Sequence, residues 1–314
     1  MSSSILHITN GDFTTNYLKE LNFSGDFITW REMLSEGKTT TDVGSEAFWK
    51  NRFEFFKTSY KVSKQKFIEY TLKEYRNLCN KKNNKEIVLW FEHDLFCQIN
   101  MLAVLSWLNR YRKGYDISLI CSGKIGNSTK MYSISELNKN QINNHFKNRV
   151  ALSQDDIEYA DYIWQLYCSD SPLRLETVYK FNPMSPFHYL ATAIEAHLQR
   201  FPSIKNGLNK IENTVLETAQ NQNFTSKKEL ISTLIQEQKV YGLGDLQYEH
   251  SIDTLNPLFN SFNPVKLSKK GKQVLENQLN FYGQIRNDIS YLGGSKKYSF
   301  LFQNDSKKLL QITS

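Results

Sequence analysis

Three consecutive ionisable residues, Glu92, His93 and Asp94, directly follow the apolar run Ile87-Val-Leu-Trp-Phe91. Carboxylates beside an imidazole can hold a hard divalent cation through oxygen ligands, and they can move protons during hydrolysis or group transfer. A helix cap at this point needs only one short polar side chain, which Asp94 alone supplies. We therefore interpret the triplet as a candidate catalytic cluster.

Polar residues also follow the other apolar segments of the N-terminal part. The phrase Asn10-Gly11-Asp12 comes shortly after Ile5-Leu-His-Ile8, and Arg31-Glu32 comes after 26–30. We predict that the polar residues after these apolar segments form one site. The catalytic candidates are Asp12, Glu92, His93 and Asp94; the ligand-binding candidates are Asn10, Gly11, Thr14, Arg31, Glu32, Gln98 and Ser122; and the candidate metal ligands are Asp12, Glu92 and Asp94.

Three interpretations of these residues remain open. The first is a divalent cation held by the carboxylates. The second is an anionic group held by backbone N–H groups at the helix start after Gly11, with Arg31 as a forked donor. Asp12 would then repel an unaccompanied phosphate, so a metal or a ribose is its more consistent partner. The third is a buried ion-pair network, in which Arg31 pairs with Glu92 or Asp94 and no ligand binds.

Four apolar segments, at 5–8, 26–30, 86–91 and 115–120, predict strands, and helical patterns lie between them. The unbroken apolar run before Glu92 is typical of a strand buried on both faces. We therefore expect an α/β fold: a Rossmann-like parallel sheet of about four or more strands. The carboxyl ends of parallel strands meet at one edge, where ligands bind, so the polar endings should converge there.

The chain is predicted to divide into an α/β domain at 1–130 and a mainly helical domain at 131–314. Capping-box and Ser-Pro patterns predict helix starts near 134, 154, 172, 187, 206, 227 and 244. The segment 227–277 is arranged like a winged helix. Its second helix, at 244–256, carries three carboxylates and no Lys or Arg, so we predict that it does not bind nucleic acid.

The composition excludes several classes of protein. The net charge of +7 is divided between the N-terminal part and the last fifty residues, which favours a mixed surface over a polyanion-binding stripe. The four cysteines show no Cys-x-x-Cys pair, so we expect reduced thiols and neither disulfides nor a zinc cluster. No apolar run approaches a membrane span, and the first residues lack a signal-peptide pattern. We expect a cytoplasmic protein without membrane contact.

Several phrases resemble a bacterial family catalogued as domain of unknown function 1835. They are His7-Ile-Thr-Asn-Gly-Asp12, Trp30-Arg31-Glu32 and Trp90-Phe-Glu-His-Asp94 with Gln98 beyond. The C-terminal part resembles the associated helical domain, numbered 3658, through Tyr189-Leu, Pro202-Ser-x-x-Asn-Gly-Leu208, Gly244-Asp245 and Tyr291-Leu-Gly-Gly294. The resemblance covers nearly the whole chain. It implies a bacterial two-domain protein and brings no activity with it.

Two functions fit these observations. The first is an intracellular protein whose α/β domain binds a nucleotide-like or phosphorylated ligand, with a metal-assisted hydrolase or transferase as its enzymatic form. The alternative is a ligand-sensing regulatory or adaptor protein, whose helical domain contacts another protein or, less favourably, nucleic acid. The absence of a phosphate loop, a Rossmann glycine triad and a nucleophile elbow argues against the standard ATPases, dehydrogenases and hydrolases. The sequence indicates neither the reaction nor the oligomeric state.

Overall fold

The computed structural model describes residues 5–82, 84–126, 128–178 and 185–312. Its strands are β1 (Ile5–Asn10), β2 (Asp26–Trp30), β3 (Gly37–Lys38), β4 (Glu86–Glu92), β5 (Asp116–Ser122), β6 (Val150–Ala151), β7 (Phe259–Phe262), β8 (Val265–Leu267), β9 (Tyr291–Gly293), β10 (Ser295–Lys296), β11 (Phe300–Gln303) and β12 (Lys308–Gln311). Its α-helices are α1 (Asp12–Glu20), α2 (Glu46–Tyr60), α3 (Lys64–Phe67), α4 (Lys73–Asn80), α5 (Leu95–Tyr111), α6 (Lys139–Lys147), α7 (Gln154–Tyr167), α8 (Leu175–Val178), α9 (Leu190–Leu198), α10 (Lys210–Asn221), α11 (Lys227–Glu237), α12 (Asp245–Thr254), α13 (Lys269–Leu275) and α14 (Tyr282–Ile285). Shorter turns of other helix types are η1 (Ile68–Leu72, a π-helix), η2 (Ile134–Glu136), η3 (Asn256–Leu258) and η4 (Lys297–Ser299).

The main sheet has five strands in the order β2-β1-β4-β5-β6. β2, β1, β4 and β5 are parallel to their neighbours, and the short β6 is antiparallel to β5. The predicted α/β character and the mostly parallel sheet are therefore confirmed. Numbered within the sheet alone, the order is 2-1-3-4-5, and in such a fold the strand order reverses between β1 and β4. Doubly wound sheets bind ligands at the carboxyl ends of the strands, beside such a reversal.

The strands end later than the sequence predicts. Asn10, Glu92 and Ser122 are the last residues of β1, β4 and β5, and Glu92 lies in register with Ser122. These three side chains are therefore held by strand backbone, whereas the sequence predicts all three in the turns that follow the strands. The reason is that polar residues still pair in a parallel ladder when their neighbours supply the apolar contacts.

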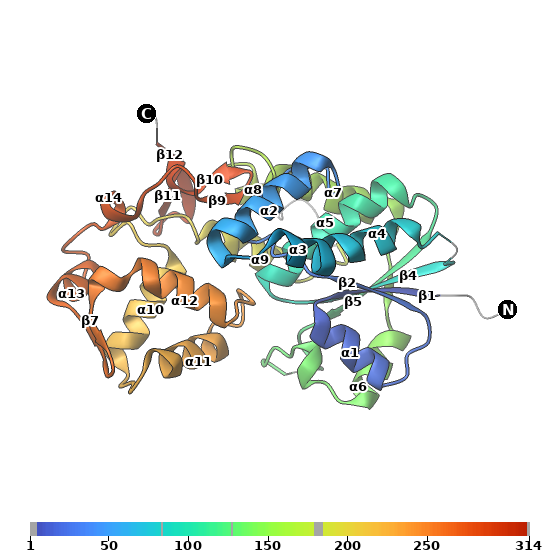
Figure 1. Ribbon diagram of the computed structural model, residues 1–314, viewed down its shortest axis with the longest axis horizontal. Helices are drawn as coiled ribbons and strands as arrows, with labels where there is room; N and C mark the ends of the chain where they lie inside the picture. Colours follow the sequence, from blue (N-terminus) through green and yellow to red (C-terminus); the bar gives the residue numbers. More distant parts are fainter. Residues whose placement is uncertain (1–4, 83, 127, 179–184, 313–314) are drawn as a thin grey trace.

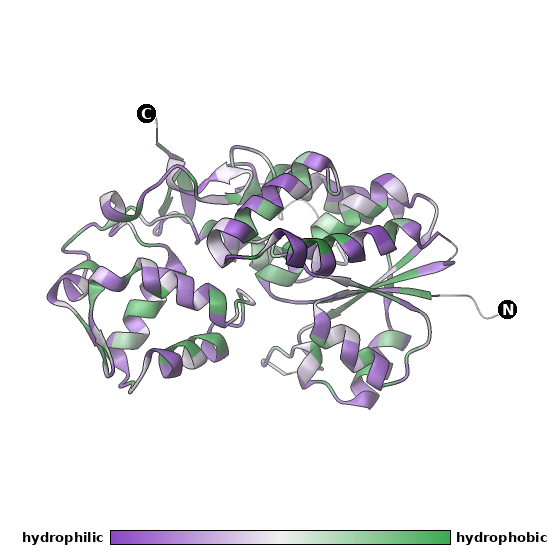
Figure 2. Ribbon diagram, viewed as in Figure 1, coloured by the Kyte–Doolittle hydropathy of each residue, from purple (hydrophilic) through white to green (hydrophobic). Residues whose placement is uncertain are grey.

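Helices cover both faces of the sheet, as Figure 1 shows, with α1 and α6 on one face and α2–α5 and α7 on the other. The side chains of β4 contribute to the cores on both faces, because they point alternately to one face of the sheet and the other. Ile87, Leu89 and Phe91 belong to the larger core on the α5 side, and Val88 and Trp90 to the smaller core on the α1 side. The greenest ribbon in Figure 2 lies in these strands and in the central helices. The sheet therefore has a core on each face, as the unbroken apolar run predicts.

Helix α5 is apolar around most of its circumference and buried from Leu95 to Leu108. It packs between the sheet and the later helices α7 and α9. The same core continues into α10–α13 and the C-terminal strands. None of the helices in the described ranges is long and apolar enough to cross a membrane.

The later half is helical with short strands between the helices. Predicted starts near 154, 227 and 244 agree with α7, α11 and α12, whereas α8, α9 and α10 begin three or four residues after the predicted 172, 187 and 206. For α10 the cause is its cap, since the Asn209 side chain accepts from the Glu212 N–H. The sequence missed most of the short strands, including β9, which pairs in parallel with β3. The division at residue 130 stays a prediction.

Candidate functional site

The β4–α5 turn carries the triplet Glu92-His93-Asp94. Asp94 caps α5 as its type predicts, because its Oδ1 accepts from the Cys97 N–H at 2.9 Å. Glu92 ends β4, and its Oε1 accepts from the Ile134 N–H at 2.9 Å. His93 and Asp94 are buried, with 7% and 5% of their surface exposed. The turn is thus ordered by one cap and one side-chain hydrogen bond.

A loop from the C-terminal part closes this turn. The loop comprises residues 239–243, between α11 and α12, and we call it the strap. The Leu95 N–H donates to the Val240 carbonyl at 2.8 Å, and the Phe96 N–H donates to the Tyr241 carbonyl at 3.2 Å. These bonds satisfy amides of α5 that a helix leaves free at its N-terminus.

Gly242 of the strap lies directly against Asp94. Its φ is +64°, and a Cβ placed there would lie 2.0 Å from the Asp94 Oδ1. Only glycine fits this approach without displacing the strap or the carboxylate. The preceding Lys239 forms an ion pair with Glu136 at 3.1 Å, which ties the strap to η2. The strap therefore covers the cluster that the sequence identified.

Glu92, Asp94 and Cys97 form a compact group, with one potential ligand atom from each within 4.8 Å of the others. Burial, followed by the charge of Asp94, raises the pKa of Glu92 to about 7. Burial also raises the pKa of Asp94 and that of the Cys97 thiol. Within the described part of the chain, neither carboxylate forms an ion pair. A half-buried acid beside a buried one, without a cationic partner, is costly in charged form.

Further polar atoms around this group have no hydrogen-bond partner among the described residues. They are the Oε1 of Gln98 and the Oγ of Ser122, whereas the ring of His93 interacts with the Ser122 backbone. The Nε2 of Gln98 donates to the Glu92 carbonyl at 2.8 Å, which places this side chain at the end of β4. Burial lowers the pKa of His93, so its neutral form is favoured. Buried polar atoms are normally satisfied, so this group of exceptions is informative.

The β1–α1 turn lies beside this cluster. Asn10 joins the two, because its Nδ2 donates to the Cys97 Sγ at 2.9 Å and its Oδ1 accepts from Asn100 at 2.8 Å. Gly11 is the N-cap residue of α1 with φ 90°, and no side chain caps that helix. A Cβ at Gly11 would meet no atom within 4 Å. Thr14, in the first turn of α1, is buried. The N-terminus of α1 is therefore open, whereas the strap covers the N-terminus of α5 at the β4–α5 turn.

Asp12 is not in the group of Glu92, Asp94 and Cys97 and pairs with Arg31 at 2.6 Å. The Arg31 Nη1 also donates to the Tyr70 carbonyl at 2.9 Å, in the π-helix η1. The pair lines an open cavity of about 470 Å³, whose other lining residues are Asn16, Glu69, Tyr70, Lys73 and Glu74. The predicted metal set of Asp12, Glu92 and Asp94 is therefore not the compact group of the structure, in which Cys97 stands in place of Asp12.

Glu32 lies in a separate buried ion pair. Its Oε2 accepts from the Arg52 Nε at 2.8 Å, and both side chains are almost fully buried. Burial raises the pKa of Glu32, and the Arg52 charge opposes that rise. The ion-pair interpretation thus describes Glu32, with Arg52 as partner, whereas Arg31 pairs with neither Glu92 nor Asp94. No local pattern points to Arg52, because its pairing with Glu32 is set by tertiary packing.

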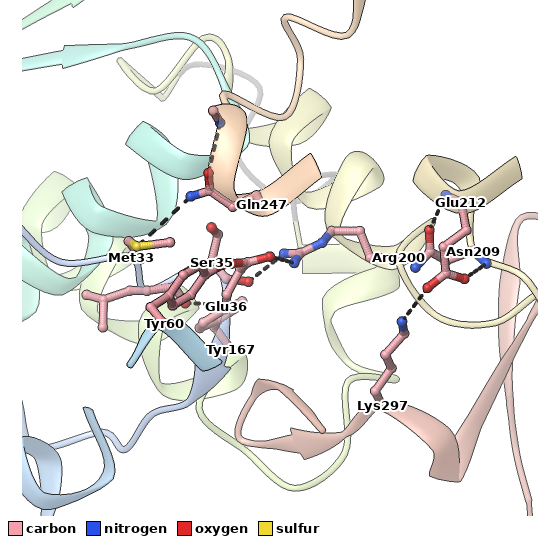
Figure 3. A network of polar contacts seen from close by, with 12 residues as sticks. Met33, Ser35, Glu36, Tyr60, Tyr167, Arg200, Asn209, Glu212, Gln247 and Lys297 are labelled. Atoms are coloured by element: carbon pink, nitrogen blue, oxygen red, sulfur yellow. Dashed lines mark hydrogen bonds and ion pairs between the residues drawn. The ribbon is translucent and has the colours of Figure 1, made fainter. Parts of the chain in front are cut away.

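A larger cavity, of about 760 Å³, lies away from the strand ends, between α2 and α12. Arg200 crosses its floor, donating to the Ser35 carbonyl and reaching Glu36 at 3.4 Å, and Tyr60 donates to Glu36 at 2.6 Å (Figure 3). To the right in the same view, Lys297 pairs with Glu212 at 2.9 Å. Arg200 and Lys297 are thus paired with carboxylates, and none of the predicted site residues lines the cavity. The predicted site residues lie instead at and near the strand ends.

Comparisons with known proteins give no functional assignment. No family model matches the chain, and no curated protein matches its sequence. Among solved structures it is similar to the Plasmodium falciparum topoisomerase II DNA-binding, cleavage and re-ligation domain, with a TM-score of 0.45 and 10% identity. The match covers 81% of this chain and 42% of that one. A likeness at this level carries no argument about function.

Proposed function

We propose that the carboxyl edge of the sheet binds a nucleotide-like or phosphorylated ligand and acts on it as a metal-assisted hydrolase or transferase. The observation that carries this proposal is the β1–α1 turn. It combines an uncapped helix N-terminus, open space in front of Gly11 and the cavity beside Arg31. A free helix N-terminus favours an anion, because its N–H groups point outward and the helix dipole is positive there.

The residues of the open cavity suit such a ligand. Arg31 and Lys73 supply positive charge, and the ring of Tyr70, 52% exposed, offers a face for stacking a base. Asp12 is already paired with Arg31, so its oxygens suit a ribose hydroxyl better than a phosphate. The pair is partly exposed, and exposed pairs contribute little stability, so Arg31 can exchange partners readily. Glu92, His93 and Asp94, at the end of the neighbouring strand β4, are the candidates for proton transfer.

Arg31→Gln tests this proposal. We expect the affinity for nucleoside triphosphates, measured by calorimetric titration, to fall at least about tenfold, since a charge-assisted contact contributes about 1.5–3 kcal/mol. Arg110→Gln is the control, because Arg110 also forms a partly exposed ion pair with an aspartate, Asp42, and neither residue lines the cavity. Unchanged affinity in Arg31→Gln would contradict the proposed site. Phosphate release with and without divalent cations then distinguishes turnover from binding alone.

The second candidate is a ligand-sensing regulatory or adaptor protein. The observation that favours it is the strap, which connects the C-terminal helices directly to the β4–α5 turn. A ligand that moves the strap would move α11 and α12 with it. Ligand binding without any conversion of the ligand, accompanied by changed amide exchange in α12, would favour this candidate over an enzyme.

The proposal extends to the C-terminal segment, the domain division, the family and the location of the protein. The order α11, α12, β7–β8 hairpin and α13 is consistent with a winged-helix-like segment at 227–277. Its helix α12 carries Asp245, Glu249 and Asp253, and Asp253 pairs with Lys227 at 2.6 Å. Such a surface would repel phosphates, so we propose a protein contact there rather than DNA binding. We also propose a two-domain division near residue 130, membership of the family 1835 with its associated domain 3658, and a cytoplasmic location.

A further inference from the structure

The group of Glu92, Asp94 and Cys97 has an electrostatic imbalance that the fold itself does not relieve. Three acidic groups converge within 4.8 Å under the strap, and none of them forms an ion pair with a described Lys or Arg. Lys239, the nearby cation of the strap, is paired with Glu136 instead. Burial of uncompensated acids costs stability, and a bound cation is a common way in which proteins compensate it.

A second observation points to a ligand at the same place. His93 lies between two of the acids in sequence and is more than nine-tenths buried, with its ring next to the Ser122 backbone. Gln98 and Ser122 are fully buried beside Glu92 and each has an unpartnered oxygen. Ser122 is in register with Glu92, and the Gln98 Nε2 donates to the Glu92 carbonyl, so both side chains lie at the end of β4 that carries the acidic group. Buried polar atoms are normally satisfied, so their free oxygens are the second observation at this place.

We propose that Glu92, Asp94 and Cys97 bind a divalent cation of the zinc class. The sulfur ligand selects among metals. Thiolate favours borderline-soft cations such as Zn²⁺ and Co²⁺, whereas Mg²⁺ and Ca²⁺ prefer all-oxygen sites. The hard cation expected from the sequence is therefore replaced by a softer one, because Cys97 stands where Asp12 was expected.

The surroundings of Cys97 fit a thiolate ligand. The Asn10 amide donates to its sulfur at 2.9 Å, and Asn10 is itself held by Asn100. Hydrogen bonds of this kind orient a metal ligand and stabilise its charge. A bound cation would also deprotonate a thiol that burial otherwise keeps neutral. Catalytic use of the cation rests on the proposed function above, whereas its binding does not.

Cobalt absorption tests this site in the full-length protein after treatment with a chelator. We expect CoCl₂ to bind at one equivalent and to produce the near-ultraviolet charge-transfer absorption of a thiolate–cobalt bond. ZnCl₂ should displace the cobalt, and a large excess of MgCl₂ should not. Cys97→Ser should abolish the absorption and weaken cobalt binding by more than about 100-fold, since loss of an outer-shell partner alone costs about 10–100-fold.

Two variants make the result decisive. Cys121→Ser is the matched control, because this neighbouring buried thiol contacts Gln98 and is not in the group, and it should keep the absorption. Asp94→Asn keeps the helix cap, so it should weaken cobalt binding in a folded protein. The proposal is overturned if wild type shows no thiolate–cobalt absorption, if the absorption survives Cys97→Ser, or if MgCl₂ competes equally. Nucleotide titration of the same samples separates the two proposals: nucleotide binding without cobalt binding overturns only the metal site, and the reverse overturns only the proposed ligand.

Discussion

The β1–α1 and β4–α5 turns occupy equivalent positions at the carboxyl edge of one sheet, yet one is open and the other is closed. At α1 no side chain caps the helix and nothing fills the space in front of Gly11. At α5 the cap is Asp94, and the next amides bond to the Val240 and Tyr241 carbonyls. The same topology therefore provides a ready binding surface at one turn and a covered cluster at its neighbour. The two turns differ more in how accessible they are to a ligand than in the types of residue that they carry.

The largest effect should come from forcing the strap away from the β4–α5 turn. In Gly242→Ala the new Cβ would clash with the Asp94 carboxylate at a positive φ. We expect a loss of unfolding free energy of about 2–4 kcal/mol, from backbone strain and overpacking together. We also expect alkylation of Cys97, followed by peptide mass spectrometry, to accelerate at least about tenfold, because local opening exposes the thiol.

Gly114→Ala is the control for this prediction. Gly114 has φ +81°, but a Cβ there would meet nothing within 4 Å, so the variant carries the strain without the clash. It should cost about 1 kcal/mol and leave Cys97 as slowly alkylated as in wild type. Equal alkylation rates in both variants would mean that the strap does not control access.

The covered cluster should also make stability depend on pH. The pKa of Glu92 rises from 4.5 to about 7 in the folded chain, so the folded state holds a proton that the unfolded state has already lost. Without metal, the unfolding free energy should therefore fall as pH rises from about 4.5 to 7, by on the order of 3 kcal/mol, and then level off. Denaturant titrations across this range should show the slope, and Glu92→Gln should remove most of it.

Glu86→Gln is the matched control, at the other end of β4. The Arg149 hydrogen bond lowers the pKa of Glu86, so its contribution to stability is lost as pH falls and the variant should not flatten the Glu92 slope. Saturating ZnCl₂ should reverse the wild-type trend, because metal binds the deprotonated ligands. A wild-type curve that already rises with pH without metal would contradict the raised pKa.

The smallest effect should come from Asp94→Asn. Asn caps a helix about as well as Asp, so the thermal stability without metal should change by about 1 kcal/mol or less, or increase as a buried charge is removed. Asp94→Ala should cost about 1–2 kcal/mol more than the Asn variant, since it also removes the cap. If both variants are equally destabilised, the charge of the Asp94 carboxylate stabilises the fold. The difference between the capped and the open turn would then give no indication of function.

Local patterns in the sequence predicted the sheet and the position of its polar edge. The apolar run before Glu92 and the Asp94 cap depend only on neighbouring residues, and both agree with the structure. The position of Cys97 near Asp94 could also have been predicted, because the residue three positions after a helix cap donates its amide to the capping carboxylate. It was missed because a buried cysteine in an apolar helix is usually only a packing residue.

Other features depend on contacts that no local pattern contains. The strap lies far along the chain from the turn it closes, and its residues read as an ordinary loop between two helices. Arg52 satisfies Glu32 across 20 positions, and β3 pairs with β9 near the opposite terminus. Such pairings are set by how the whole core packs, so they could not be predicted from periodicity or capping signals.

The position of the strap in the chain also sets an order of events during synthesis. The sheet strands through β5 and all three acidic groups precede the strap by more than a hundred residues. At about 5–20 residues per second, a ribosome needs on the order of ten seconds to produce that interval. A cation that meets the growing chain in this period finds the cluster uncovered, whereas one that arrives later must wait for the strap to open. Metal binding to the cluster would then depend largely on the cations that are present while the chain is being synthesised.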